Sequence, residues 1–323
     1  MNKKLTVITP IKHLTNVEII LKTIPKINLV YLPNCDMEDF KLNNDSYALF
    51  TNPNKSNIFL GKENLKTFKN LKYICTASTG TLHIDKSYCK QKGINIISLT
   101  EERHVINKIP STAEHAFALM LSSVRNINIA NKSVLKNEWD YEPFLGRQIK
   151  SLIIGVIGYG RLGNFFSNYC DNFGAKVLVY DPYKSVNHPR IEQVKSLDEI
   201  AEFSDIISLH VHVNEETNKM INSNFLKICK NSVLIVNTSR GEIINENDLT
   251  EFLSINKSAK YATDVLSGEI DGIYNNPIKK YFDDNQDQVI ITPHIGGMTK
   301  EAQNMAFGHA ANLLKKALLN EID

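Results

Sequence analysis

Short apolar runs alternate along this chain with stretches in which apolar residues recur every three or four positions. That alternation is typical of an α/β protein, in which helices connect mostly parallel strands. The first hundred residues show the pattern weakly. They favour four strands, at Leu5–Ile8, Tyr47–Phe50, Tyr73–Thr76 and Ile94–Ile97.

A clearer helix start follows at residues 110–114, which read Pro-Ser-Thr-Ala-Glu. Ser111 and Glu114 have the spacing of a capping box, in which the two side chains bind each other's backbone N–H groups. The apolar residues of one helical face come next: Phe117, Met120, Leu121 and Val124. We expect this long helix to separate two domains.

The strand pattern strengthens after Ser151. The expected strands are Leu152–Ile157, Lys176–Tyr180, Asp205–Leu209, Ser232–Asn237, Lys260–Asp264 and Val289–Ile291. Helices such as Arg161–Phe173 and Glu246–Ile255 separate them. Six strands joined by such crossovers make a complete doubly wound sheet. From Thr299 the chain reads as a single helix that could return to the first domain.

Residues 158–163 read Gly-Tyr-Gly-Arg-Leu-Gly and fit the dinucleotide-binding pattern G-x-G-x-x-G. The pattern alone is weak, but here it directly follows a strand and opens a helix. Gly158 would allow the tight turn, Gly160 the approach of a pyrophosphate, and Gly163 close packing of the helix on the strand. The helix N-terminus, at Arg161 and Leu162, would offer N–H groups to the phosphates.

Asp181 ends the strand after this helix. A carboxylate at that place accepts hydrogen bonds from the adenosine ribose and repels a 2′-phosphate, which favours NAD over NADP. The alternative is an ordinary turn residue before Pro182. The glycine motif upstream makes the ribose contact the preferred interpretation.

Charge and cysteines narrow the function class. The net charge of +2 comes from 37 basic and 35 acidic residues without a basic stripe, so it predicts neither a nucleic-acid nor a membrane partner. The five cysteines form no C-x-x-C pair, which disfavours disulfides and zinc ribbons and favours a reducing, cytoplasmic compartment. No apolar run is long enough for a membrane span.

Several separate motifs together resemble one known family, the D-isomer-specific 2-hydroxyacid dehydrogenases. The resemblance covers nearly the whole chain and is densest over residues 113–297. The motifs are Ala113-Glu114-His115, the glycine loop with Asp181, Ser208-Leu209-His210-Val211, Asn237-Thr238-Ser239-Arg240-Gly241, Asp264-Val265 with Glu269, and Thr292-Pro293-His294-Ile295-Gly296-Gly297.

This resemblance implies an NAD-dependent oxidoreductase that transfers a hydride between the nicotinamide and a small D-2-hydroxy acid or 2-keto acid. It implies two doubly wound, Rossmann-like domains with the active site in the cleft between them. Residues 1–104 and 298–323 would form the substrate domain, and residues 105–297 the NAD-binding domain. A homodimer is expected through the helix and arm at residues 113–146, which include Trp139.

The resemblance places Arg240, Glu269 and His294 in the active site. Arg240 would bind the substrate carboxylate and carbonyl, because a guanidinium binds such groups bidentately. His294 would be the acid–base residue, since an ordinary imidazole has a pKa of about 6.5, and Glu269 would raise the pKa of His294. Without the resemblance, Arg240 would be a surface arginine and Glu269 a loop glutamate.

The other expected ligand contacts also come from the resemblance. Backbone N–H groups of Thr79 and Gly80 would bind the substrate carboxylate. Besides the glycine loop and Asp181, the cofactor would contact His210, Thr217, Thr238 and Asp264. His115 would cap or pack on its own helix. No metal site is expected.

Two segments depart from the family pattern. His212 stands where the family commonly has proline. The segment 101–109 is longer than usual and contains Arg103, His104 and Lys108, which either meet an acidic substrate or face water; we favour water.

Three other functions remain open at this stage. An NAD-sensing, non-catalytic regulator of the same fold would tolerate loss of the active-site residues, but all three are present. A formate dehydrogenase pairs its histidine with glutamine, whereas this chain has Glu269. A phosphite dehydrogenase-like enzyme has the same three residues and is not distinguished by them. The identity of the acid and the physiological direction do not follow from the sequence.

Overall fold

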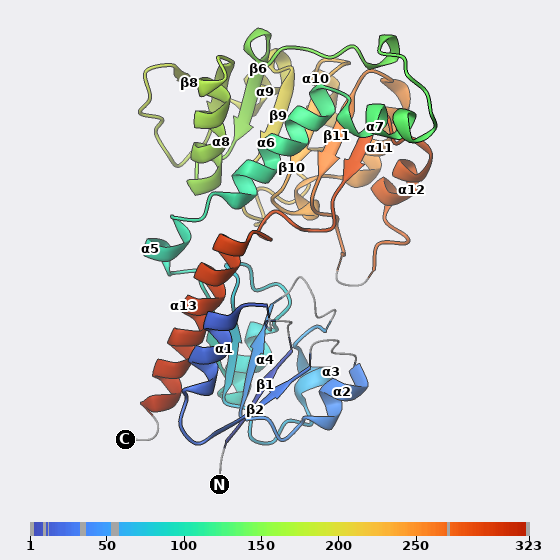
Figure 1. Ribbon diagram of the computed structural model, residues 1–323. Coiled ribbons are helices and arrows are strands. Elements are labelled where there is room, and N and C mark those ends of the chain that lie inside the picture. The colour runs from blue at the N-terminus through green and yellow to red at the C-terminus, as the bar shows by residue number, and fades with distance from the viewer. Residues whose placement is uncertain are drawn as a thin grey trace. The chain divides into compact units, whose positions relative to one another are not determined.

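The structure is a computed structural model, and it describes residues 3–8, 11, 13–32, 37–52, 58–269 and 272–320. The chain forms two compact units: unit 1 contains Met1–Ile109 and Met298–Asp323, and unit 2 contains Pro110–Gly297. Each unit has its own parallel sheet with helices packed on it (Figure 1). The two-sheet α/β fold expected from the sequence is therefore confirmed.

Unit 1 holds five parallel strands in the order β2-β1-β3-β4-β5. The strands are β1 (Lys3–Val7), β2 (Ile27–Tyr31), β3 (Ala48–Thr51), β4 (Tyr73–Thr76) and β5 (Asn95–Ile97). The helices are α1 (Thr15–Lys22), α2 (Met37–Leu42), α3 (Lys62–Leu65), α4 (Lys86–Lys92), α5 (Arg103–Ile106) and α13 (Lys300–Leu319). The order of the strands is that of flavodoxin-like folds.

Alternate residues of the strands in unit 1 point to opposite cores. On β3, Phe50 packs in the cluster that also contains Phe307 and Leu314 of α13, whereas Leu49 packs in the cluster with Phe40. The C-terminal helix therefore belongs to unit 1, as the sequence suggested. Strand β2 was not predicted, because this edge strand is only half-buried and its apolar pattern is weak.

Unit 2 holds seven parallel strands in the order β12-β11-β10-β9-β6-β7-β8. The strands are β6 (Ile153–Ile157), β7 (Lys176–Tyr180), β8 (Ile191–Gln193), β9 (Ile206–Leu209), β10 (Leu234–Asn237), β11 (Lys260–Thr263) and β12 (Val289–Ile291). The helices are α6 (Ser111–Val124), α7 (Ile127–Leu135), α8 (Arg161–Asn172), α9 (Leu197–Phe203), α10 (Ser223–Ile228), α11 (Glu246–Ile255) and α12 (Pro277–Asp284). The six expected strands are present, and β8 is an additional edge strand with two exposed residues.

The start of α6 differs from the expected capping box. Pro110 takes the N-cap position, and its carbonyl accepts hydrogen bonds from the backbone N–H groups of Ala113 and Glu114. Ser111 is already helical, and its buried hydroxyl has no hydrogen-bond partner within the described part of the chain. The capping-box prediction was wrong, because the N-cap is Pro110, whose carbonyl accepts the first helical hydrogen bonds, and no described side chain caps the helix. The apolar face of the helix does pack on the core of unit 2.

Unit 2 begins at Pro110, five residues later than the expected boundary, since α5 packs on α13 within unit 1. No described helix is both long and apolar enough to cross a membrane. Cys75, Cys89, Cys170 and Cys229 are buried free thiols. Cys35 lies outside the described residues.

Candidate functional site

The glycine loop follows β6, and its three glycines have different surroundings. Gly158 has a φ of +92°, and a Cβ there would lie 2.7 Å from the carbonyl oxygen of His210. A Cβ on Gly163 would lie 1.9 Å from the carbonyl oxygen of Gly158. No atom lies within 4 Å of a Cβ on Gly160, so the space before the N-terminus of α8 is open. That space, next to Arg161 and Leu162, suits a pyrophosphate.

The carboxylate of Asp181 lies beside this loop, at the end of β7. Its Oδ2 accepts a hydrogen bond of 2.7 Å from the backbone N–H of Tyr159 within the loop. Its Oδ1 accepts from the N–H groups of Tyr183 and Lys184, which holds the turn after Pro182. Asp181 therefore is a turn residue, but Oδ2 retains a lone pair that a ribose hydroxyl can use.

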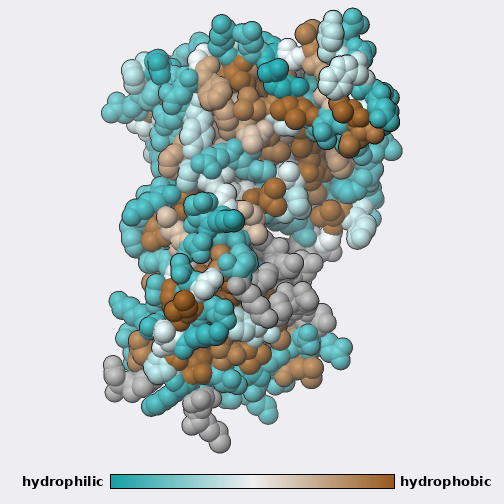
Figure 2. Space-filling view, viewed as in Figure 1, coloured by the Kyte–Doolittle hydropathy of each residue, from teal (hydrophilic) through white to brown (hydrophobic). Residues whose placement is uncertain are grey.

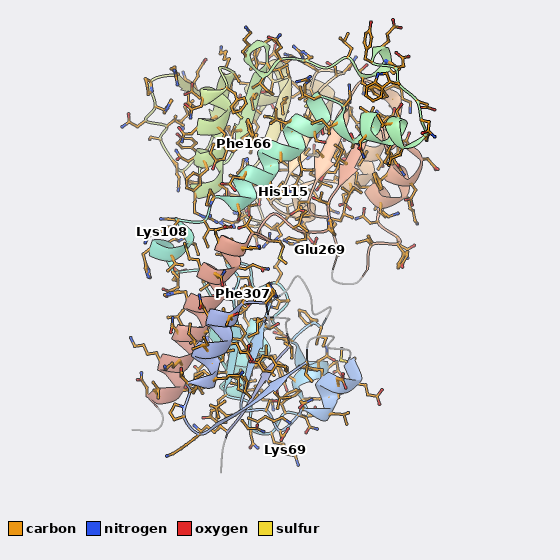
Figure 3. The ribbon with its side chains drawn as sticks, viewed as in Figure 1. Lys69, Lys108, His115, Phe166, Glu269 and Phe307 are labelled. Atoms are coloured by element: carbon orange, nitrogen blue, oxygen red, sulfur yellow. The ribbon has the colours of Figure 1, made fainter. Side chains whose placement is uncertain are left out.

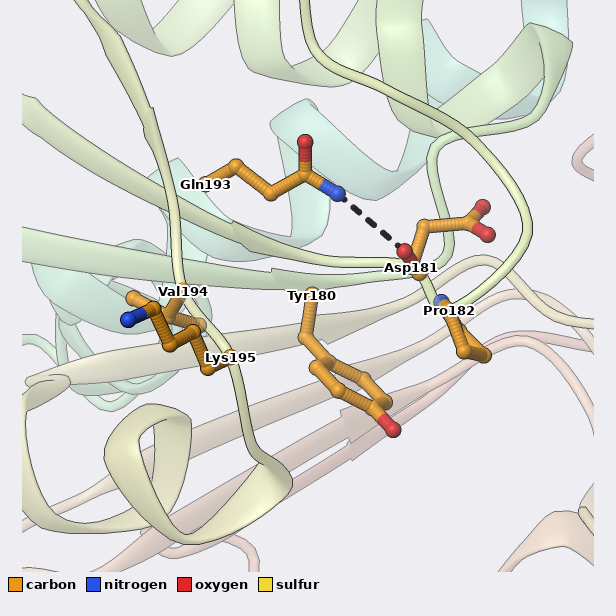
Figure 4. Close-up of a pocket in the computed structure, with 6 residues that line it drawn as sticks. All are labelled: Tyr180, Asp181, Pro182, Gln193, Val194 and Lys195. Carbon is orange, nitrogen blue, oxygen red and sulfur yellow. Dashed lines mark hydrogen bonds between the residues drawn. The ribbon is translucent and has the colours of Figure 1, made fainter.

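An open pocket of about 400 Å³ adjoins Asp181. Figure 4 shows the residues that line it: Tyr180, Asp181, Pro182, Gln193, Val194 and Lys195. The Gln193 side chain donates to the backbone carbonyl oxygens of Asp181 and Lys184, and so ties β8 to the turn. A planar base with its ribose fits an open pocket of this size next to the glycine loop.

His210 follows β9 and supports the loop from the protein side. Its Nε2 lies 2.9 Å from the hydroxyl of Ser208, and its ring packs on Phe166. The residue is half-buried, but Nδ1 is fully buried and has no hydrogen-bond partner. Burial lowers the pKa of His210 to about 3, so the ring is neutral. The residue lies close to the glycine loop with its ring directed into the protein, and its contact with a cofactor stays a prediction.

The turn after β10 presents Arg240. Within it, the buried Asn237 side chain donates to the carbonyl of Arg240 and accepts from the N–H of Ser239. A Cβ on Gly241 would lie 2.0 Å from the backbone nitrogen of Ser267, so only glycine fits there. One guanidinium nitrogen, Nη1, donates to the carbonyl of Ser239 at 2.6 Å. The other N–H groups of the guanidinium remain available to an anionic ligand.

Two further expected cofactor residues are Thr217 and Thr238, and only Thr217 holds a turn through its side chain. The Thr217 hydroxyl donates to the backbone carbonyl of His212 at 2.6 Å. Thr238 is buried, and its hydroxyl has no hydrogen-bond partner among the described residues. A buried hydroxyl of this kind, two residues before Arg240, can bind a polar group of a ligand.

Asp264, after β11, holds the turn that carries His294. The Asp264 carboxylate accepts hydrogen bonds from the Thr292 hydroxyl at 2.6 Å and from the N–H groups of Ile295 and Gly296 at 2.8 and 2.7 Å. Burial acts to raise the pKa of Asp264, but hydrogen bonds from His115 and these groups outweigh it and hold the pKa below its ordinary value. The carboxylate is therefore ionised and used by the protein itself, whereas the sequence suggested only a cofactor contact.

His115 takes part in the same network. Its Nε2 lies 2.9 Å from the Thr292 hydroxyl and 3.3 Å from Oδ1 of Asp264. The expectation that His115 caps or packs on its own helix was wrong, because its side chain points away from α6 and contacts the turn after β12. Figure 3 labels His115 on α6 and Glu269 in the same unit.

His294 and Glu269 form a close pair. The Nδ1 atom of His294 lies 2.6 Å from Oε1 of Glu269, and about three tenths of each side chain is exposed, 27% and 31% respectively. His294 has a φ of +54°, in the left-handed region, and its backbone N–H donates to the carbonyls of Asp264 and Thr292. Such a conformation costs of order 1–3 kcal/mol and is common at functional sites. With Nδ1 held by a carboxylate, Nε2 is the atom suited to proton transfer.

All these motifs follow strands of one sheet at the same edge. Arg240 follows β10, Glu269 follows β11 and His294 follows β12, and these three strands are neighbours. The glycine loop and Asp181 follow the neighbouring strands β6 and β7. Ligands of open α/β sheets bind at this carboxyl edge. Unit 2 thus has the glycine loop and Asp181 on one side of this edge, and Arg240, Glu269 and His294 on the other.

Thr79 and Gly80 belong to unit 1, where they follow β4. The hydroxyl of Thr100 donates to the carbonyl of Thr79, and that of Ser78 donates to the carbonyl of Gly80. These bonds hold the loop in place. The expected contact of the loop with a substrate stays a prediction.

Comparisons with known proteins show the family to which the chain is similar. The family model described as "D-isomer specific 2-hydroxyacid dehydrogenase, NAD binding domain" matches residues 117–296. The hydroxypyruvate reductase of Thermotoga maritima is 35% identical over 73% of this chain and 74% of its own length. The D-3-phosphoglycerate dehydrogenase of Archaeoglobus fulgidus is 35% identical over 75% of this chain, but the match spans only 44% of that relative.

The fold is also similar to a solved structure. The D-lactate dehydrogenase of Aquifex aeolicus, in complex with NAD and lactic acid, matches with a TM-score of 0.77 and 28% identity. The match covers 99% of this chain and 96% of that chain.

Proposed function

Since the chain belongs to the D-isomer specific 2-hydroxyacid dehydrogenase family, we propose that it transfers a hydride between NAD and a small D-2-hydroxy acid or 2-keto acid. One observation carries this proposal: the 2.6 Å contact between His294 and Glu269, with Arg240 in the turn after the strand β10 of the same sheet edge. An acid–base pair beside a cation is what reduction of a keto acid requires.

Residues 117–296 match the family's NAD-binding domain. The residues around the glycine loop are of the kinds that bind NAD. The open space at Gly160 admits a pyrophosphate, the N-terminus of α8 offers N–H groups, and Asp181 retains a lone pair beside an open pocket. A carboxylate at Asp181 disfavours a 2′-phosphate. When bound, the nicotinamide supplies or accepts the hydride.

The proposed reaction adds a hydride to the carbonyl carbon and a proton to its oxygen, which converts the keto acid into the hydroxy acid. Arg240 binds the substrate carboxylate and polarises the carbonyl through its unused N–H groups. His294 donates the proton from Nε2 in reduction and accepts it in oxidation. Glu269 holds and orients the imidazole through Nδ1.

A panel of acids tests the function. Purified protein is assayed with NADH and glyoxylate, hydroxypyruvate, pyruvate and 3-phosphohydroxypyruvate, and with NAD plus phosphite or formate. We expect turnover of at least one 2-keto acid that His294→Ala nearly abolishes. Turnover of phosphite alone would identify a phosphite dehydrogenase-like enzyme. NAD binding without any turnover would identify a non-catalytic, NAD-sensing regulator. Either result would overturn the proposal.

We also propose a homodimer through residues 113–146. Four apolar side chains of the arm are largely exposed: Leu135 at 76%, Trp139 at 91%, Tyr141 at 86% and Leu145 at 89%. Figure 2 shows hydrophobic residues among hydrophilic ones on the visible face. Exposed apolar residues clustered in this way mark an association surface. Sedimentation should show a dimer that Trp139→Lys with Leu145→Lys weakens, whereas a monomeric wild type contradicts it.

Two finer assignments rest on the same proposal. Thr79 and Gly80 would bind the substrate carboxylate, so Thr79→Pro, which removes the backbone N–H, should raise KM more than it lowers kcat. The buried free thiols are consistent with a reducing, cytoplasmic compartment.

A further inference from the structure

Three side chains with metal-ligating atoms gather in unit 1, apart from the residues assigned above. Glu102 is the N-cap of α5, His104 lies on α5, and His309 lies on α13. One ligand atom of each lies within 4.8 Å of the others. The labelled Lys108 and Phe307 mark these two segments in Figure 3.

The contacts within the cluster are close to those of a coordinated ion. Nε2 of His309 lies 2.6 Å from Oε2 of Glu102, and Nδ1 of His104 lies 3.8 Å from the same oxygen. The two imidazole rings meet edge to face with their centroids 5.2 Å apart. Tetrahedral zinc, with bonds of about 2.0–2.1 Å to nitrogen and oxygen, separates its ligand atoms by roughly 3.3 Å. Both observed distances lie within about 1 Å of that value.

The burial of the three residues also suits a site that can close on an ion. The side chains of His309 and Glu102 are 23% and 25% exposed and contact each other, whereas the side chain of His104 is 71% exposed. His104 can therefore rotate toward the other two without repacking the core. Two imidazoles and one carboxylate are the donor set that zinc and its neighbours prefer over calcium or magnesium.

We propose that Glu102, His104 and His309 bind one divalent transition-metal ion of the zinc type, with the fourth position open to water. The ion takes the place of the hydrogen between His309 and Glu102, and the neutral imidazole of His309 then carries its proton on Nδ1 while Nε2 binds the ion. The ion would join α5 to the helix α13. Helix α5 lies just before Ile109, where the first segment of unit 1 ends. The segment 101–109 thereby gains a role that the oxidoreductase reaction does not give it.

Metal titration of the full-length protein without a histidine tag tests this proposal. Chelator-treated protein is titrated with ZnCl₂ by calorimetry and with CoCl₂ by visible absorption. We expect one equivalent of zinc per chain and the intense absorption bands of tetrahedral cobalt. Zinc should also raise the midpoint of thermal unfolding, because an ion that binds only the folded chain stabilises it.

Two variants and a control make the test specific. His104→Ala removes an exposed ligand and leaves the fold intact, and Glu102→Gln removes the charged ligand. Each should weaken zinc binding by at least about tenfold, since even residues that only support a ligand contribute about 10–100-fold. His13→Ala is the matched control, because His13 also contacts α13, through Gln303, but lies outside the cluster; it should bind zinc as the wild type does.

Equal zinc affinity in the wild type and in both variants would overturn the proposal, as would a cobalt spectrum without tetrahedral bands. In either case the cluster is only a hydrogen-bonded His309–Glu102 pair with a nearby imidazole. The titration does not depend on the oxidoreductase assay, so failure of one proposal is distinguishable from failure of the other.

Discussion

The Nε2 atom of His115 lies 3.3 Å from Oδ1 of the buried carboxylate of Asp264. This contact joins α6 to the turn after β12, because Asp264 also holds the backbone of that turn through Ile295 and Gly296. His294 lies within the turn with a left-handed backbone. The position of the His294 imidazole therefore depends on a network formed by His115, Thr292 and Asp264.

Replacing His115 should disturb the reaction through this network. In His115→Ala, the Thr292 hydroxyl and Asp264 lose a partner in a partly buried site, which should cost about 1–3 kcal/mol of stability. We expect kcat to fall about tenfold, equivalent to about 1.4 kcal/mol, with NAD affinity nearly unchanged. His188→Ala is the control, since His188 also lies beside an aspartate, Asp171, but outside the site. Equal kinetics in the two variants would remove His115 from the positioning network.

The stability of unit 2 should depend on pH through Asp264. Its pKa is below the ordinary value in the folded protein, so its ionised form adds stability above the unfolded pKa of about 3.9. That stability is lost as pH falls through the lower folded pKa. Asp264→Asn should therefore be less stable than the wild type at pH 7, and the difference should shrink at acidic pH. Denaturant unfolding at a series of pH values measures it, and a constant difference would contradict the assignment.

His210 adds an acid sensitivity at higher pH. Burial lowers its pKa to about 3 in the folded protein, while an unfolded imidazole takes up a proton below about pH 6.5. The unfolded state therefore binds more protons between these values, and stability should fall as pH decreases across this window. In His210→Asn this part of the pH dependence should be absent. An identical slope in wild type and variant between pH 6.5 and 4 would show that His210 is not the group responsible.

A positive charge at position 240 should not be sufficient for substrate binding without the geometry of a guanidinium. Lysine keeps the positive charge in Arg240→Lys but cannot form a bidentate fork. We expect kcat/KM for the keto acid to fall by an amount equivalent to about 2–4 kcal/mol, while NADH binding is retained. Near-normal efficiency in a folded variant would show that Arg240 does not bind the substrate.

The pair of Glu269 and His294 should act as one unit in the reaction. Glu269→Gln keeps a hydrogen-bonding group near Nδ1 but removes the negative charge beside the imidazole. We expect kcat/KM to fall at least about tenfold in both directions, equivalent to about 1.4 kcal/mol, while NAD binding is retained. Normal kcat/KM in folded, cofactor-binding protein would show that the two residues are not coupled, and the acid–base proposal would be withdrawn.

The sequence by itself determined the α/β class, the strong strands and the glycine loop, because these depend on local patterns. Gly158 and Gly163 are examples. The absence of a Cβ can be read from the sequence, and the structure then shows backbone atoms so close to both residues that a Cβ would not fit. The resemblance to a family added the roles of Arg240, Glu269 and His294; without it, Arg240 would be a surface arginine and Glu269 a loop glutamate.

Only the tertiary structure decided which of these motifs are neighbours. The strand order sets β10, β11 and β12 side by side, and crossover connections allow many orders for the same pattern. It also decided that His115 reaches Asp264 and that Glu102, His104 and His309 meet, although no metal site was expected from the sequence. Side chains that come from distant segments share no spacing along the chain, so packing alone brings them within hydrogen-bond distance.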